Sequence, residues 1–253
     1  MNNTLSFSLP ICIRPSETNQ QGVLRSDATA NYMEDIATQH ATALGVGLSA
    51  LQAHNISWAM SKMRISFHSR PAANTSLTLK TRPSVGQHNT YLREFFFEDT
   101  HGKRCITAIT WWVAFDLTSR KMTPLPESLN TFPQDSQPEL ESTITIPPIK
   151  RVPQTFNGPS FTIRRADIDQ NNHVNNVRYV SFVEEAGLAY NPQATLKCIE
   201  LIFRAECHYG DTIATTNGLE KEISSTEYTL LHSLHTENGE LLRGRSFWKR
   251  YSD

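Results

Sequence analysis

The sequence predicts an α+β fold of two similar tandem units, each with one long helix wrapped by an antiparallel β-sheet. Three observations lead to this prediction. Segments of the first half recur in the same order in the second half, a proline-rich stretch separates the halves, and each half holds one amphipathic helical segment among alternating apolar ones. A helix must bury its apolar stripe, and a sheet face is the economical partner for it.

The repeat is sparse in identities but ordered. The first match has a constant shift of 150 residues and pairs Arg14 with Arg164, and the second match has a shift of 136. The difference, 150 less 136, places about fourteen extra residues in the first half, most simply within Gly45–Ser57. Similarity that recurs in order indicates a duplicated structural unit. The matched segments are 13–35 with 163–185, 66–77 with 202–213, and 101–111 with 238–248.

In the first half a helix is predicted over Asp27–Leu44, with Ser26 as its N-cap and Gly45 as its stop. A serine side chain accepts from an unpaired amide of the first turn, and glycine adopts the left-handed conformation that ends helices. Alternation and β-branched or aromatic residues predict strands after the helix. These strands lie around 63–67 and 77–79 and over 91–98 and 104–116, the last two joined by a turn at 100–102.

The stretch Leu117–Pro159 contains eight of the 13 prolines, which excludes a continuous helix or a central strand. We expect an extended linker there. The predicted domains are an N-terminal unit over 1–130, the linker over 131–158 and a C-terminal unit over 159–253.

The second half repeats the plan, with a helix predicted over Asn176–Ala189 and an asparagine as its cap. Before it, a strand is expected over 161–164, and after it an alternating strand that ends at Glu206, on the face opposite Ala205. Further strands are expected over 212–219, 228–235 and 241–248, with Asn238–Gly239 as a hairpin turn.

Polar residues gather just before the second helix, where free amides and the helix dipole favour negative charge. Asp169, Asn171 and His173 stand two residues apart there. The first half lacks this set, since the positions of Asp169, Asn171, His173 and Glu206 hold Asn19, Gln21, Val23 and Arg70.

The run D-x-N-x-H-V-N-N-x-x-Y from Asp169 to Tyr179, with R-x-E-C at Arg204–Cys207, closely resembles the acyl-acyl-carrier-protein (acyl-ACP) thioesterases of plant plastids and bacteria. The resemblance covers nearly the whole chain. It implies a double hot-dog fold, release of free fatty acid from acyl carrier protein in fatty acid biosynthesis, and an acyl-chain pocket lent largely by the first half. It also implies a catalytic quartet of Asp169, Asn171, His173 and Glu206. No cofactor is expected.

A thioester hydrolase needs a nucleophile, a group that activates it and donors for the oxyanion. Glu206 can activate water or attack directly, and apolar walls beside it would raise its pKa. His173 and Asn171 would position the water or the carbonyl, and Asp169 would orient both. Cys207 is a disfavoured nucleophile, because neighbours in a strand point to opposite faces and Cys207 would then face away from His173.

Two alternatives remain beside the acyl-ACP thioesterase. An acyl-CoA thioesterase of the same fold would grip the same pantetheine arm. A non-enzymatic acyl-binding protein of this fold would not need the four polar residues concentrated in one half, which disfavours it.

The bulk properties exclude other classes. A net charge of −1 indicates no basic surface for nucleic acid. Neither a leader sequence nor a run of about eighteen apolar residues is present, so a cytoplasmic protein without a membrane span is expected. The four cysteines lack C-x-x-C spacing, which favours free thiols, and the histidine spacings predict no metal site. The oligomeric state stays open, with a homodimer as one option.

Overall fold

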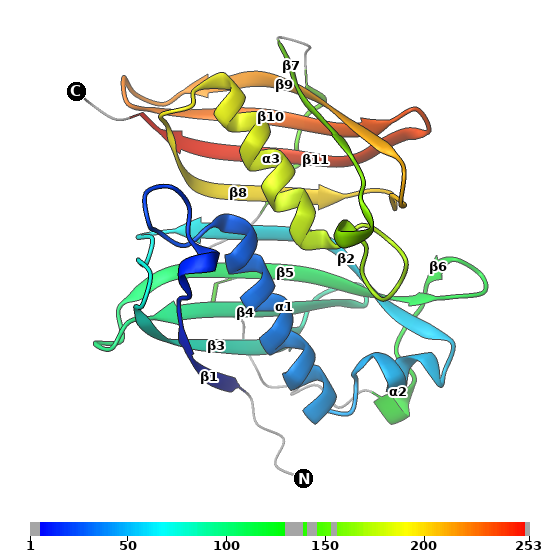
Figure 1. The fold of residues 1–253 in the computed structure, drawn as a ribbon. Helices are drawn as coiled ribbons and strands as arrows, with labels where there is room; N and C mark the ends of the chain where they lie inside the picture. Colours follow the sequence, from blue (N-terminus) through cyan, green and yellow to red (C-terminus); the bar gives the residue numbers. More distant parts are fainter. Residues whose placement is uncertain (1–5, 130–138, 141–145, 153–155, 251–253) are drawn as a thin grey trace. The chain divides into compact units, whose positions relative to one another are not determined.

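The computed structural model describes residues 6–129, 139–140, 146–152 and 156–250 (Figure 1). The chain divides into two compact units, Met1–Met63 with His68–Thr145 and Arg64–Phe67 with Ile146–Asp253. Most of the predicted linker lies outside the described residues. None of the helices in the described ranges combines the length and apolarity that a membrane crossing requires.

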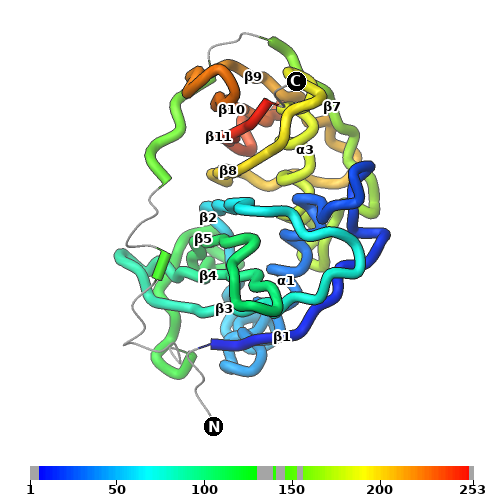
Figure 2. Tube along the Cα trace, turned by 90° about the vertical axis from the view of Figure 1, so that its left-hand side faces the viewer, coloured from blue at the N-terminus to red at the C-terminus, as the bar shows by residue number. Residues whose placement is uncertain are grey.

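The first unit places a long helix on an antiparallel sheet, as predicted. Its strands follow the order β1-β3-β4-β5-β2, and β6 pairs with β5. Helix α1 packs on β1 and β3, on one face of the sheet (Figures 1 and 2). The elements are β1 (Phe7–Cys12), α1 (Ser26–Ala43), α2 (Leu48–Gln52), β2 (Ile56–Phe67), β3 (Ser76–Val85), β4 (Thr90–Glu98), β5 (Arg104–Asp116) and β6 (Lys121–Met122).

The start of α1 corrects one expectation. Arg25 is the N-cap, and Ser26 is a buried residue of the first turn whose Oγ accepts a hydrogen bond from Arg70 Nη2 at 3.0 Å. The predicted stop is confirmed, because Gly45 follows the helix with a φ of 76°. The short helix α2 lies within the predicted insertion Gly45–Ser57.

Strand β4 is buried on both faces. Phe95 and Phe97 are fully enclosed, and the buried Arg93 donates to Nδ1 of His40 on α1 at 3.2 Å. On the opposite face, Leu92 and Phe96 pack with Leu140. The aromatic strand is therefore core on both sides.

The second unit repeats the arrangement. Its strands follow the order β8-β11-β10-β9-β7, and α3 packs on β7, β9, β10 and β11. Residues 146–152 lie on the other face of this sheet (Figure 2), where Arg243 Nη1 donates to the Ile149 carbonyl at 3.3 Å. The elements are β7 (Phe156–Thr162), α3 (Asn176–Tyr190), β8 (Thr195–Phe203), β9 (Thr212–Glu222), β10 (Glu227–Thr236) and β11 (Gly239–Lys249).

Two features fix α3 against its sheet. Gly187 lets the helix approach β11 closely, since a Cβ there would stand 2.1 Å from the Trp248 ring. Beneath the helix, the enclosed His232 bonds to Asn217 at 2.7 Å and to Ser246 at 2.6 Å. Burial lowers the pKa of His232 to about 3, so the ring is neutral at physiological pH.

The backbone confirms the repeat and corrects its third segment. Leu24 N donates to the Pro71 carbonyl in the first unit, and Val174 N donates to the Cys207 carbonyl in the second, which matches the shifts of 150 and 136. The third match slips by one residue after its turn, because Ile106 follows its partner Phe97 by nine positions whereas Leu242 follows its partner Leu234 by eight. The second turn comprises Glu237 and Asn238, since Thr236 pairs with Gly239.

Candidate active site

The loop before α3 presents three of the predicted residues. Asp169 Oδ1 accepts from the amides of Asn171 at 2.8 Å and His173 at 3.4 Å, and Asp169 N donates to the His173 carbonyl at 2.9 Å. Asn172 turns the chain with a φ of 65°, a conformation that asparagine tolerates better than most residues. Asp169 thus folds the loop that carries Asn171 and His173.

The helix start anchors this loop from the other side. Asn175 Oδ1 accepts from Val177 N at 2.7 Å, which confirms an asparagine cap. The buried Asp167 accepts from Arg164 and forms an ion pair with Arg178 at 2.9 Å. Burial raises the pKa of Asp167, but the hydrogen bonds and charges of the arginines outweigh burial and hold it below its usual value.

Glu206 comes from a strand exit, and not from the strand that the alternation predicted. Strand β8 ends at Phe203, and the Leu241 carbonyl then accepts from the amides of both Arg204, at 2.9 Å, and Ala205, at 3.3 Å. Because one carbonyl serves two successive amides, the chain leaves the ladder. Glu206 and Cys207 therefore lie beyond the end of β8, and strand geometry does not decide which way their side chains point.

The chain that leaves β8 nevertheless places Glu206 beside His173. The bond from Val174 N to the Cys207 carbonyl, at 2.8 Å, joins the two segments, and His173 Nε2 lies 3.3 Å from Glu206 Oε2. The Glu206 side chain is 39% exposed, which is more open to solvent than the enclosed carboxylate that was expected. Asn171 is exposed, with its amide Nδ2 3.4 Å from Asp169 Oδ2.

Cys207 is buried and turned toward Asp211. Its thiol donates to Asp211 Oδ2 at 3.4 Å. Burial and this carboxylate raise the pKa of the Cys207 thiol to about 12, so the thiolate is scarce at neutral pH.

His208 is a neighbour that sequence reasoning missed. Its ring lies 5.2 Å from the His173 ring, centroid to centroid, and its Nδ1 bonds to the Asn172 carbonyl at 3.2 Å. Histidine spacing could not reveal this proximity, because the strand exit creates it. The sequence carried no signal for this proximity, because the burial of Cys207 between the exposed Glu206 and His208 depends on the path of the chain after β8.

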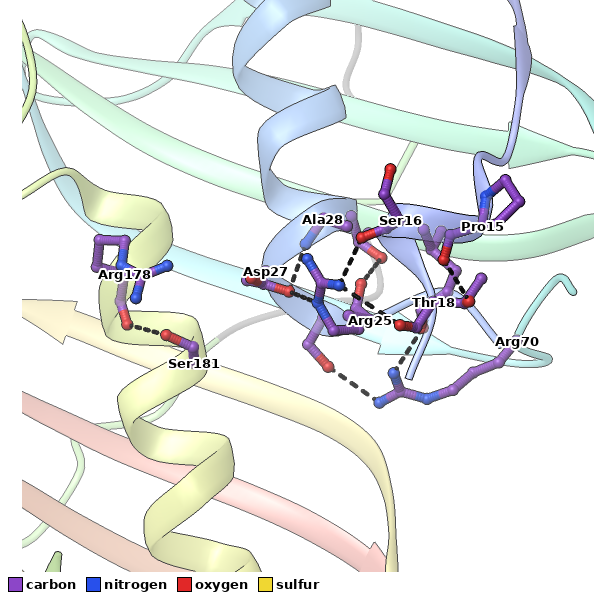
Figure 3. A network of polar contacts seen from close by, with 12 residues as sticks. Pro15, Ser16, Thr18, Arg25, Asp27, Ala28, Arg70, Arg178 and Ser181 are labelled. Atoms are coloured by element: carbon purple, nitrogen blue, oxygen red, sulfur yellow. Dashed lines mark hydrogen bonds and ion pairs between the residues drawn. The ribbon is translucent and has the colours of Figure 1, made fainter. Parts of the chain in front are cut away.

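The first unit repeats the loop without the chemistry. Asn19 Oδ1 accepts from the amides of Gln21 at 3.0 Å and Val23 at 3.2 Å, as Asp169 does in the second unit. At the position of Glu206, Arg70 donates to the Leu24 carbonyl and to Ser26 (Figure 3). The reactive groups are thus confined to one of two similar frames.

Family models match both halves of the chain. The model of the acyl-ACP thioesterase N-terminal domain matches residues 6–131, and that of the C-terminal domain matches residues 151–250. Curated relatives include a chloroplastic palmitoyl-acyl carrier protein thioesterase of Gossypium hirsutum, 24% identical over 97% of this chain and 64% of its own length. A chloroplastic oleoyl-acyl carrier protein thioesterase 2 of Arabidopsis thaliana is 26% identical over 100% of this chain and 79% of its own length.

Solved structures share the fold. A putative oleoyl thioesterase from Lactobacillus plantarum superposes with a TM-score of 0.82 at 18% identity, covering 100% of this chain and 99% of that one. The 12:0-ACP thioesterase from Umbellularia californica gives a TM-score of 0.83 at 19% identity, covering 98% and 95%. The α+β architecture is therefore the double hot-dog arrangement that the sequence predicted.

Proposed function

Because the chain belongs to the acyl-ACP thioesterase family, we propose that it hydrolyses the thioester between a fatty acyl chain and acyl carrier protein and releases the free fatty acid. The observation that carries the proposal is the pair His173 and Glu206, 3.3 Å apart beside the start of α3. A carboxylate and an imidazole at this distance can share one water molecule, as general-base hydrolysis requires.

In the proposed reaction, Glu206 takes a proton from that water while His173 holds it. The water oxygen attacks the thioester carbonyl carbon, and the Asn171 amide donates to the developing oxyanion. The carbon–sulfur bond then breaks, the fatty acid leaves, and the proton on Glu206 passes to the thiolate of the phosphopantetheine arm.

Asp169 acts in this proposal as a positioning residue. Its carboxylate holds the amides of Asn171 and His173 and also lies near the Asn171 side chain. Two side chains that must act together are thereby carried by one folded loop, and preorganisation of this kind lowers the barrier to reaction.

The cysteine alternative receives less support. A nucleophilic Cys207 would need an accessible thiolate beside a base. Cys207 as a whole residue is 1% exposed, and its thiol donates to Asp211, whose negative charge disfavours the thiolate.

Thiol release from acyl-ACP and acyl-CoA substrates of graded chain length tests the proposal with one preparation. Faster turnover of the ACP substrates is expected. A preference for CoA substrates would instead favour the acyl-CoA thioesterase. Stoichiometric acyl binding without thiol release would favour the non-enzymatic alternative.

We propose that residues 1–130 form the N-terminal domain, 131–158 the linker and 159–253 the C-terminal domain. The proposed partner is acyl carrier protein, which carries the acyl substrate. Leu129 packs in the core of the first unit, and β7 begins the second sheet at Phe156, three residues before the proposed bound.

A cytoplasmic location is consistent with the four free cysteines, since thiols persist in reducing compartments. Fractionation of cells with an antibody to the chain tests the location.

A further inference from the structure

Three potential metal ligands converge beside α3. One side-chain atom each of His173, Glu206 and His208 lies within 4.8 Å of the others, and the pair His173 Nε2 and Glu206 Oε2 is 3.3 Å apart. Zinc binds imidazole nitrogen and carboxylate oxygen at about 2.0–2.2 Å, so that ligand atoms on a tetrahedral ion stand about 3.4 Å apart. One pair already has this separation.

The hydrogen bond that Nδ1 of His208 makes leaves its Nε2 available to bind a metal ion. The Asn172 carbonyl can only accept, so Nδ1 of His208 donates to it at 3.2 Å. In the neutral ring the lone pair is then on Nε2. Metal-ligating histidines commonly donate their second nitrogen to a carbonyl in this way, which fixes both tautomer and ring orientation.

Backbone hydrogen bonds hold the ligand segments together, while the side chain of Glu206 can adjust. His208 N donates to Asp211 Oδ2 at 2.9 Å, and Val174 N donates to the Cys207 carbonyl at 2.8 Å. The carboxylate of Glu206 is exposed, so it can shift toward His208 without moving the core, while His208 keeps its bond to the Asn172 carbonyl.

The first unit provides an internal comparison. The positions of His173, Glu206 and His208 in the same loop frame hold Val23, Arg70 and Ala72. None of these side chains ligates a cation at neutral pH, so the first frame has no equivalent set.

We propose that His173, Glu206 and His208 bind one Zn²⁺ ion and that its binding reversibly inhibits the enzyme. Imidazole with carboxylate suits zinc and cobalt better than magnesium. Inhibition rests on the proposed function, because the ion would occupy the lone pairs of His173 and Glu206 that are needed to hold and deprotonate water. Binding of the ion does not rest on it.

The binding experiment uses the full, untagged, chelator-treated chain with Cys12→Ser, because Cys12 is the exposed thiol among the four. Calorimetric titration with Zn²⁺ and the visible spectrum of bound Co²⁺ report affinity, stoichiometry and ligand geometry. We expect one ion per chain and an affinity reduced at least about 100-fold by His208→Gln, since even an indirect partner of a ligand is worth about 10–100-fold. His101→Gln, at an exposed turn of the first unit, is the matched control.

Unchanged zinc affinity in His208→Gln, with circular dichroism showing a folded chain, would indicate an adventitious ion only and overturn the proposal. Glu206→Gln provides a second variant with the same expectation. In the activity assay, Zn²⁺ should lower turnover in proportion to occupancy, EDTA should restore it, and Mg²⁺ should have no effect. Full turnover with the site occupied would overturn the inhibition. If no acyl substrate is hydrolysed, the function fails while the titrations still decide the metal site.

Discussion

At the scale of single residues, the reactive chemistry is divided between groups that face solvent and one that does not. Glu206 and His208 are exposed, His173 is half-buried, and Cys207 lies between them in sequence but is enclosed. Neighbouring side chains therefore differ in what they contact, because Glu206 and His208 meet solvent while the Cys207 thiol meets Asp211.

Replacement of Glu206 by glutamine tests the general base. The volume is kept and the base is lost, so kcat should fall by about 10²–10⁴-fold while the unfolding midpoint stays near that of the parent chain. Steady-state kinetics on acyl-ACP and a thermal melt provide the two readouts. Glu185→Gln, at an exposed position of α3, is the control for loss of a surface charge. Near-normal turnover would remove Glu206 from the mechanism.

Replacement of Cys207 by alanine tests the thiol. Most turnover should remain, because burial and Asp211 keep the thiol protonated at neutral pH. Iodoacetamide should alkylate the exposed Cys12 long before Cys207. A mass spectrum that shows an acyl group on Cys207 during turnover would contradict the water mechanism.

At the scale of the elements, α3 is fixed by a close approach and by a buried hydrogen-bond network. The close approach depends on Gly187 beside Trp248, and the network depends on a neutral His232. Each makes a separate prediction about stability.

Gly187→Ala should destabilise the chain. Alanine is more favourable than glycine in a helix interior by about 1 kcal/mol. Its Cβ would overlap the Trp248 ring, however, and overpacking of this kind costs about 1–3 kcal/mol. Urea unfolding measures the difference. In a Trp248→Leu background the overlap is removed, and the same substitution should become neutral or stabilising. Equal effects in both backgrounds would rule out the overlap as the cause.

His232 should make stability depend on pH. Its pKa is about 3 in the folded chain, against about 6.5 when unfolded, so protons bind preferentially to the unfolded state below pH 6.5. The stabilisation is complete above that pH and is lost at roughly 1.4 kcal/mol per pH unit as pH falls toward 3. Unfolding curves of the parent and His232→Gln, compared between pH 7 and 5, measure it. Parallel losses in both chains would exclude this role.

At the scale of the whole molecule, the duplicated plan could be predicted from the sequence because periodicity and caps act locally. The helices predicted over Asp27–Leu44 and Asn176–Ala189 are found at Ser26–Ala43 and Asn176–Tyr190. The geometry near Glu206 could not be predicted, because the double acceptance at the Leu241 carbonyl depends on the partner strand and leaves the alternation unchanged. The proximity of His208 to His173 has the same origin.

The two frames permit a matched pair of substitutions. Asn171→Ala should lower kcat by about 10²-fold, in the range for loss of one oxyanion donor. Gln21→Ala removes the corresponding exposed amide of the first unit and should change kcat less than about twofold, since no reactive set surrounds it. Parallel kinetics on one acyl-ACP substrate measure both, and equal losses would show that the chemistry is not confined to the second unit.

The strand exits are built from main-chain atoms alone: the Cys105 carbonyl accepts from His68 N and Ser69 N, as the Leu241 carbonyl accepts from Arg204 N and Ala205 N. A turn of the chain that depends on no particular side chain tolerates mutation at the positions just beyond it. Two copies of one plan can therefore both fold although only one of them carries reactive groups. Arg70 occupies such a position in the first unit and has a structural role, because it donates to the Leu24 carbonyl and to Ser26 at the start of α1.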